Sequence, residues 1–323
     1  MLALSPACFL MGCGRSVPSV RPISTAPIQT PSDGVSTTSP IANIFIEPER
    51  FAATAKLESW DYDGQPIAGV VNHHSLAMDL IAQFFKTLKS ARPEIKTFII
   101  LSPDHFAQGR DISTSRLSYS TPGGLLKVDG RISSPKANAP RAQNIEFRIS
   151  NMTGSSSSSF QPSIFPPFPV WDGTASRAFE KEHGVGALVP FIKREFPDAE
   201  IVPVFLSHDA PRERLLVLGR ALASFADDTT FVVLSSDMSH YQRREDTVVR
   251  DRETMQWLAY GDWTRLESAT DKNSDSSAGF TVLYKYLSVL KAKKDFRLMS
   301  HANSYDYTHD PANVTSYIVG FWE

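Results

Sequence analysis

The chain has 323 residues, enough for one large domain or two small ones. With 41% hydrophobic and 21% charged residues, its composition is that of an ordinary soluble globular protein. The 33 Lys and Arg residues nearly balance the 35 Asp and Glu residues, which gives no reason to expect nucleic acid or an anionic membrane as partner. No apolar run approaches the roughly 20 residues that a membrane-spanning helix needs.

The two cysteines, Cys8 and Cys13, both lie near the N-terminus. The rest of the chain therefore offers no disulfide and no thiolate ligand or nucleophile. A metal bound there must use imidazole and carboxylate ligands, which suits iron, zinc or manganese better than a soft metal.

Residues 1–13 resemble a bacterial lipoprotein signal, in which Cys13 would become the lipidated first residue after cleavage. A secretory signal needs a basic segment before its apolar core, whereas the first basic residue, Arg15, follows the cysteine. The alternative is a disordered N-terminus with two incidental cysteines. We therefore expect either a lipid-anchored protein of the cell envelope or a cytoplasmic one.

Residues 14–43 are rich in Ser, Thr and Pro and have no hydrophobic period, which predicts a disordered tether. Order is expected to begin near Ile44, with one domain over 44–323. Within that domain, residues 133–176 hold Ser-rich and Pro/Phe-rich stretches that we interpret as an insertion, without assigning structure to them.

The first regular segments predict a β-α-β unit. Residues 68–74 read as a short strand that runs into histidines, and apolar residues at intervals of three and four predict a helix over 76–92. Residues 96–105 are a β-branched run ending in polar residues, typical of a second strand. Such a unit implies a mainly parallel sheet with a right-handed crossover.

Later segments continue the alternation of strands and helices. A hairpin is expected within 116–131, and a helix in two pieces over 176–196. Further strands are predicted at 201–207, 230–240, 296–304 and 314–322, and further helices at 210–225, 244–259 and 278–292. The pattern predicts a single three-layer α/β domain with a mainly parallel central sheet.

Histidines gather where the predicted strands end. His73 follows the first strand, His105 ends the second, and His240 follows the strand near 230–236. Ligands of open α/β sheets bind at the carboxyl ends of strands, so these side chains and Asp237 are expected to share one site. A single histidine after a strand is more often a surface or capping residue. The prediction of a shared site therefore depends on several such side chains following neighbouring strands.

Other polar residues have a structural interpretation. His74 is expected to face away from its neighbour, because adjacent residues on an extended segment point opposite ways. Two further histidines, His208 and His301, are interpreted as structural. Glu182 and His183 precede a helical piece and could face the same pocket, although capping explains Glu182 equally well.

Six segments, in this order, resemble the Memo family, whose bacterial members are called AmmeMemoRadiSam system protein B: GVVNHHSLA, FIILSPDHFAQG, STPGGLLKVD, EHGVGALVPF, IVPVFLS and VVLSSDMSHY. The resemblance runs from about residue 66 to the C-terminus and excludes roughly 133–176. The family is related in fold to the catalytic subunits of class III extradiol dioxygenases, which hold non-haem Fe(II) with two His and one carboxylate. The resemblance therefore implies that fold and a mononuclear metal site.

Residue by residue, the resemblance places His73 and His105 at the first two ligand positions. Asp237 and His240 stand where the family has its Asp and the His that matches the dioxygenase acid/base. For Asp237, orientation of a ligand or of His240 is one interpretation, and a helix cap is the other.

The third ligand is where the chain departs from the family. Memo-type proteins with a metal take this ligand from a cysteine near the last strands, and residues 301–310 contain none. Asp306, with His309 behind it, is the expected replacement. The implied ion is most often Fe(II), with zinc or copper as alternatives.

Three functions remain open. The first is a metal-dependent oxidoreductase acting on a small molecule, with His240 as general base because imidazole titrates near neutrality. The second is a non-catalytic module that keeps the pocket for a ligand or peptide. The third is a metallohydrolase, in which the metal activates water. The companions of the family, an AMMECR-type domain and a radical SAM protein, imply pathway partners, which a lipid-anchored chain would not meet in the cytoplasm.

Overall fold

The computed structural model describes residues 39–107, 111–132, 170–171, 176–293 and 295–323. The segment that resembles a lipoprotein signal (residues 1–13), nearly all of the predicted tether and most of the predicted insertion lie outside these residues. The sheet already includes Ile41, which is 1% exposed and pairs with Tyr119, so order begins before the expected start at Ile44.

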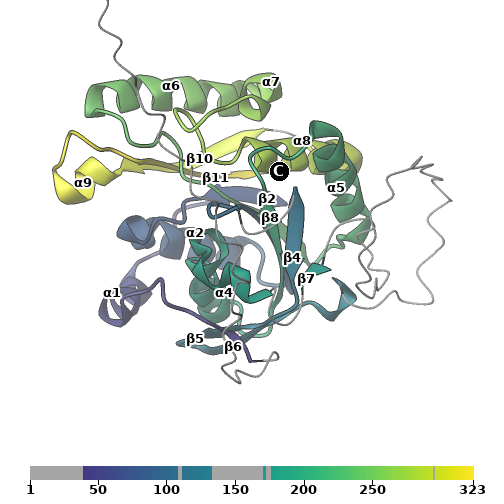
Figure 1. Cartoon of the computed structure of the whole chain (residues 1–323). Helices are drawn as coiled ribbons and strands as arrows, with labels where there is room; N and C mark the ends of the chain where they lie inside the picture. Colours follow the sequence, from purple (N-terminus) through teal and green to yellow (C-terminus); the bar gives the residue numbers. More distant parts are fainter. Residues whose placement is uncertain (1–38, 108–110, 133–169, 172–175, 294) are drawn as a thin grey trace, which may run out of the picture. The chain divides into compact units, whose positions relative to one another are not determined.

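An 11-stranded mixed sheet forms the centre of the described domain (Figure 1). Its middle is parallel, in the order β6-β8-β3-β9-β2. These strands are β2 (Ala68–Val71), β3 (Thr97–Pro103), β6 (Gly124–Val128), β8 (Glu200–Leu206) and β9 (Thr230–Ser235). The predicted α/β domain with a mainly parallel sheet is confirmed.

Antiparallel strands extend both sides of this parallel centre. β11 (Ser316–Trp322) pairs with β2, and β10 (Phe296–Asn303) pairs with β11. Beyond β6 and β8 lie four short strands: β1 (Ile41–Ala42), β4 (Ile112–Ser115), β5 (Tyr119–Thr121) and β7 (Val170–Trp171). β5 and β6 form the predicted hairpin, in which Gly124 adopts a φ of 105° that side-chain-bearing residues rarely reach.

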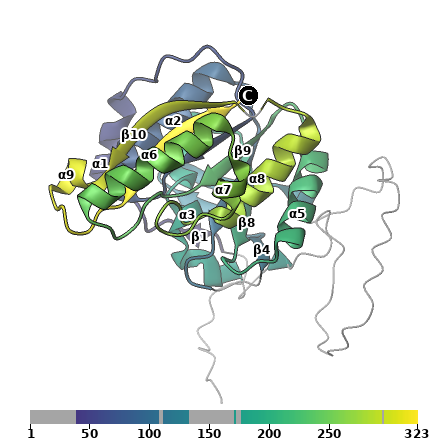
Figure 2. The same cartoon turned by 90° about the horizontal axis from the view of Figure 1, so that it is seen from above.

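Helices cover both faces of the sheet (Figure 2). One face carries α1 (Pro48–Ala53), α2 (Met78–Ala91), α3 (His183–Gly186) and α4 (Val189–Glu195), and the other carries α5 (Arg212–Phe225), α6 (Arg244–Tyr260), α7 (Trp263–Glu267) and α8 (Ser277–Leu290). The short α9 (Ser304–Thr308) follows β10. Among the described helices, none has the length and apolar character needed to cross a membrane.

The helix predicted over 176–196 is more divided than expected. A 3-10 helix (Ser176–Lys181) precedes α3 and α4, and the side chain of Glu182 caps α3 by accepting a hydrogen bond from the Gly184 amide. The chain therefore turns sharply at Glu182, which brings the start of α3 next to the end of β3.

Alternation along β3 builds a core on each face. Phe98 and Ile100 belong to the cluster under α2 and α4, whereas Ile99 and Leu101 belong to the cluster under α5 and α8. Successive side chains of a strand point to opposite faces, so one continuous apolar run serves both layers. Burial on both faces fixes the register of β3 and hence the position of the residues that follow it.

Phe84 is a test of this core. Its side chain is fully buried and stacks on Phe321 at a centroid distance of 4.8 Å. Phe84→Ala is expected to lower the free energy of unfolding by about 3–5 kcal/mol, because it removes apolar contacts and leaves a cavity. Urea denaturation measures the change, with the exposed Val248→Ala as control. A loss below about 1 kcal/mol would contradict this packing.

Candidate metal site

Polar side chains from separate segments meet at the carboxyl ends of β2, β3 and β9. His73 follows β2, His105 follows β3, and Asp237 and His240 follow β9. To these the structure adds Asp275, from the loop that precedes α8. The parallel arrangement explains the convergence, because the carboxyl ends of neighbouring parallel strands lie at one edge of the sheet.

Asp275 lies at the centre of the group. Its Oδ2 is 3.2 Å from Nε2 of His73, 3.5 Å from Nε2 of His105 and 3.8 Å from Nε2 of His240. Its Oδ1 accepts a hydrogen bond from Ser236 Oγ at 2.9 Å. Burial acts to raise the pKa of the Asp275 carboxyl, but the surrounding imidazoles outweigh burial and lower it.

Sequence reasoning missed Asp275. The residue follows no strand, and the Ser-Asp-Ser-Ser run before α8 looks like an ordinary helix start. Backbone pairing between two loops brings it to the site: the Asp275 amide donates to the Asp237 carbonyl, and the His240 amide donates to the Asp271 carbonyl. Backbone hydrogen bonds between two loops cannot be predicted from a local sequence pattern.

The structure gives Asp306 a different role from the predicted third ligand. Asp306 lies in the first turn of α9, where its Oδ2 accepts a hydrogen bond from the Asn303 amide at 2.8 Å. With the Asn303 side chain it forms a capping box, which satisfies amides that the helix leaves unpaired. His309 ends the same helix in a left-handed conformation. The carboxylate beside His73 and His105 is that of Asp275.

Ser235 fixes the orientation of the His73 ring. The Ser235 hydroxyl donates to the Gly184 carbonyl at 2.6 Å and lies 3.0 Å from His73 Nδ1. Since its single proton is used on Gly184, the hydroxyl accepts from Nδ1–H, and Nε2 is the nitrogen that faces Asp275. Burial acts to lower the pKa of His73, but Asp237 and Asp275 raise it.

Glu182 orients the His105 ring so that its Nε2 also faces Asp275. Its Oε1 is 2.6 Å from His105 Nδ1, and its Oε2 accepts from the His105 amide at 2.9 Å. The carboxylate therefore caps α3 and also fixes the imidazole, so both interpretations of Glu182 hold. Burial acts to lower the pKa of His105, but the carboxylates of Asp275 and Glu182 raise it to about 10. A carboxylate behind an imidazole is the usual support of a histidine ligand.

Asp237 holds the segment after β2. Its Oδ1 accepts from the His73 amide at 3.0 Å and from the His74 amide at 3.4 Å. Its Oδ2 is 4.0 Å from His240 Nε2, and His240 Nδ1 is buried without a hydrogen-bond partner in the described part of the chain. Asp237 thus orients the two histidines that follow β2.

His183 is a further imidazole at the site. Its ring stacks on that of His105 with centroids 4.0 Å apart and planes 29° apart. Nitrogens of His73, His105 and His183 all lie within 4.8 Å of one another, so these three side chains could together hold a metal ion. Burial and the nearby His73 and His105 lower the pKa of His183 to about 4, which leaves this ring neutral.

The two histidines interpreted as structural lie outside this group. His301 Nε2 is 2.7 Å from Asp251 Oδ2, a buried carboxylate that also accepts hydrogen bonds from Ser239 and Ser316. His208 is exposed.

A metal ion fits the central group. His73 Nε2 and Asp275 Oδ2 are both buried, and neither makes a hydrogen bond of good geometry with any residue that the structure describes. Atoms that share an ion at roughly 2.0–2.2 Å lie about 3–3.5 Å apart. The separations of 3.2 and 3.5 Å from Asp275 Oδ2 to the two Nε2 atoms agree with that spacing.

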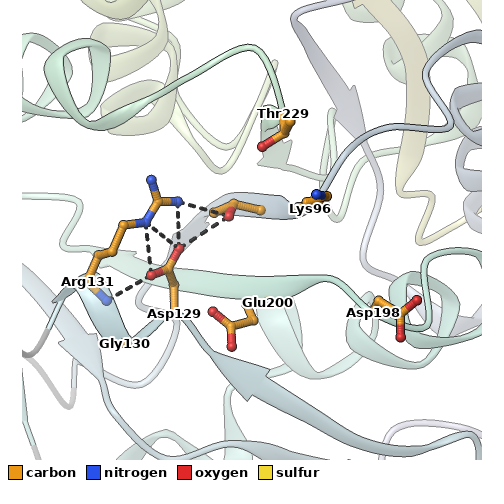
Figure 3. Close-up of a pocket in the computed structure, with 8 residues that line it drawn as sticks. Lys96, Asp129, Gly130, Arg131, Asp198, Glu200 and Thr229 are labelled. Atoms are coloured by element: carbon orange, nitrogen blue, oxygen red, sulfur yellow. Dashed lines mark hydrogen bonds and ion pairs between the residues drawn. The ribbon is translucent and has the colours of Figure 1, made fainter.

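A separate cavity of about 650 Å³ lies at the amino ends of β3, β8 and β9 (Figure 3). Arg131 lines this cavity, and its guanidinium forms an ion pair with Asp129 at 2.7 Å and donates a hydrogen bond to the Thr97 hydroxyl. Among the described residues, the group identified as able to hold a metal ion is His73, His105 and His183, and none of these lines the cavity. It is lined by Lys96, Thr97, Asp129, Gly130, Arg131, Asp198, Glu200 and Thr229.

Comparisons with known proteins find similarity to the family that the six sequence segments resemble. A family model described as Memo-like protein matches residues 168–321. A MEMO1 family protein of Caldivirga maquilingensis is 26% identical over 251 residues, which covers 75% of each chain. A MEMO1 family protein of Nitrosopumilus maritimus is 24% identical over 267 residues, which covers 79% of this chain and 84% of that protein.

A solved structure of an uncharacterized protein, JW3007, from Escherichia coli K12 covers 79% of this chain and 98% of its own, with a TM-score of 0.40 and 10% identity. The expected resemblance is confirmed: the chain is similar to Memo-like proteins over residues 168–321 and to MEMO1 family proteins over about three quarters of its length.

Proposed function

We propose that this chain is a metal-dependent protein whose ion is held by His73, His105 and Asp275. The observation that carries the proposal is the buried Asp275 Oδ2, which lies 3.2 and 3.5 Å from the two Nε2 atoms. Hydrogen bonds behind both rings already turn Nε2 inward. A buried divalent ion also needs negative charge nearby, and the carboxylate supplies it.

Asp275 fits the third ligand position better than His183 does. An imidazole binds a metal in the plane of its ring. Because the His183 ring is stacked 4.0 Å from that of His105, an ion in the plane of one ring lies away from the plane of the other. His183 then serves to support the His105 ring, with the three-histidine set as the alternative.

Two imidazoles and one carboxylate favour Fe(II), with zinc or copper as alternatives, and leave open positions for a substrate. We propose a metal-dependent oxidoreductase acting on a small molecule, in which the bound ion would supply a Lewis acid. His240 Nε2, which lies 3.8 Å from Asp275 Oδ2, would hold or accept a proton there. Asp237 keeps the His73 segment in place.

Metal analysis tests the site. Purified protein loaded anaerobically with Fe(II), and separately with zinc, is expected to retain one ion per chain after desalting. Anomalous scattering from crystals would place that ion between His73, His105 and Asp275. Protein that retains no ion under either condition would refute the proposal.

His240→Ala separates an enzyme from the alternative, a non-catalytic module that binds a ligand or peptide. Loss of a general base typically lowers turnover by about 10²–10⁴-fold. The metal content of the variant should equal that of the unsubstituted protein. Small aromatic and carbonyl compounds, offered with O₂, are the substrates to screen. Turnover that is unaffected by the substitution would favour the binding module.

The location and partners of the chain are also proposals. A lipid anchor at Cys13 would place it in the cell envelope, whereas work with AMMECR-type and radical SAM partners requires the cytoplasm. Cell fractionation, with the mass of the mature N-terminus, separates the two. A lipidated N-terminal cysteine would rule out the cytoplasmic pathway.

A further inference from the structure

His74 differs from the other imidazoles in its hydrogen bond. Its Nδ1 lies 2.7 Å from the hydroxyl of Tyr317, a fully buried residue of β11. The centroid of the Tyr317 ring is 5.8 Å from that of the His74 ring, with 66° between the planes, so a buried residue of the core contacts the imidazole.

The Tyr317 hydroxyl decides which nitrogen of His74 carries the proton. Within the described residues, His74 Nδ1 is the partner of that hydroxyl. If Nδ1–H donated to the phenol oxygen, the phenol proton would be buried without an acceptor, which is costly. The hydroxyl therefore donates, Nδ1 accepts, and the neutral ring bears its proton on Nε2.

The hydrogen-bonding role of Nδ1 in His74 is thus the reverse of its role in the two proposed histidine ligands. His73 and His105 donate through Nδ1 and turn Nε2 toward Asp275, where a metal ion would replace any proton on that nitrogen. His74 accepts through Nδ1, and its Nε2–H has no acceptor among the described residues, while the side chain is only partly buried.

The backbone of His74 adjoins the site. Its amide donates to the Asp237 carboxylate that also holds His73. His74 directly follows His73 in the chain, so its side chain starts beside the segment that carries the first proposed ligand.

We infer that His74 is a substrate-contacting residue whose Nε2–H donates a hydrogen bond to an oxygen anion, such as a carboxylate, bound at the open positions of the metal. This inference rests on the proposed metal site for the place of the ligand. The ligand class follows from the donor, because a fixed neutral N–H favours an anionic or carbonyl oxygen over a cation.

Ring tautomers test the first step on the metal-free protein. Long-range ¹H–¹⁵N NMR of ¹⁵N-histidine-labelled protein is expected to show His74 as the Nε2–H tautomer, with the signal assigned by its loss in His74→Gln. Tyr317→Phe should shift this population toward Nδ1–H. An Nδ1–H tautomer in the unchanged protein would overturn the inference, even if the metal site is present.

Acetate binding to the Co(II)-loaded protein tests the second step, with visible absorption as the readout. His74→Ala is expected to weaken acetate binding about tenfold, the effect of one charge-assisted hydrogen bond, with Co(II) affinity changed less than threefold. The exposed His208→Ala is the control. Equal acetate affinity in His74→Ala would refute the contact. If no metal bound, the proposed function would fail, whereas the tautomer measurement would still decide the state of His74.

Discussion

Asp275→Asn is expected to weaken metal binding by more than about 100-fold, the upper range for loss of a supporting residue around a ligand. The substitution keeps the size of the side chain but removes the charge that compensates a buried divalent ion. The proposed ligand atom lies 3.2 Å from His73 Nε2, so a neutral amide there changes the centre of the site. Competition with a chromophoric chelator, followed for Fe(II) and zinc, measures the affinity.

Two matched variants make this result specific. Asp306→Asn replaces the carboxylate first expected as ligand and should leave metal affinity within threefold, because that side chain caps α9. His183→Ala removes a ring that stacks on His105 and should weaken binding less than Asp275→Asn does. The reverse order of these effects would favour the three-histidine set and exclude Asp275 as ligand.

Glu182→Gln should produce the second large effect. Metal affinity is expected to fall about 10- to 100-fold, since the carboxylate behind His105 fixes Nδ1 as the donor. The amide nitrogen of Gln would also face either the His105 amide or the His105 ring, which replaces an acceptor by a donor. We therefore expect a loss of about 1–3 kcal/mol in the free energy of unfolding from unsatisfied buried groups.

Chelator competition and urea denaturation on the same Glu182→Gln sample separate the two consequences. The exposed Glu58→Gln is the control for removal of a surface charge. If Glu182→Gln is less stable but binds the metal as tightly as the unsubstituted protein, Glu182 only caps α3. Such a result would remove it from the metal site without affecting the assignment of Asp275.

The sheet and the histidine positions could be predicted from the chain because their signals are local. Apolar runs such as that of β3 are long enough to identify buried strands, and polar residues directly after them lie at the carboxyl edge of a parallel sheet. His73, His105 and His240 were found in this way. The family resemblance supported the same positions.

The carboxylate of the site was decided by tertiary structure alone. Asp275 reaches the histidines because its loop pairs through the backbone with the loop after β9, and that contact joins segments far apart in sequence. Asp306 looked equivalent by chain position, yet the unpaired amides at the start of α9 engage its carboxylate. Local patterns determine where a strand or helix ends, whereas loop pairing and capping, which depend on the folded surroundings, determine which carboxylate turns toward the proposed metal site.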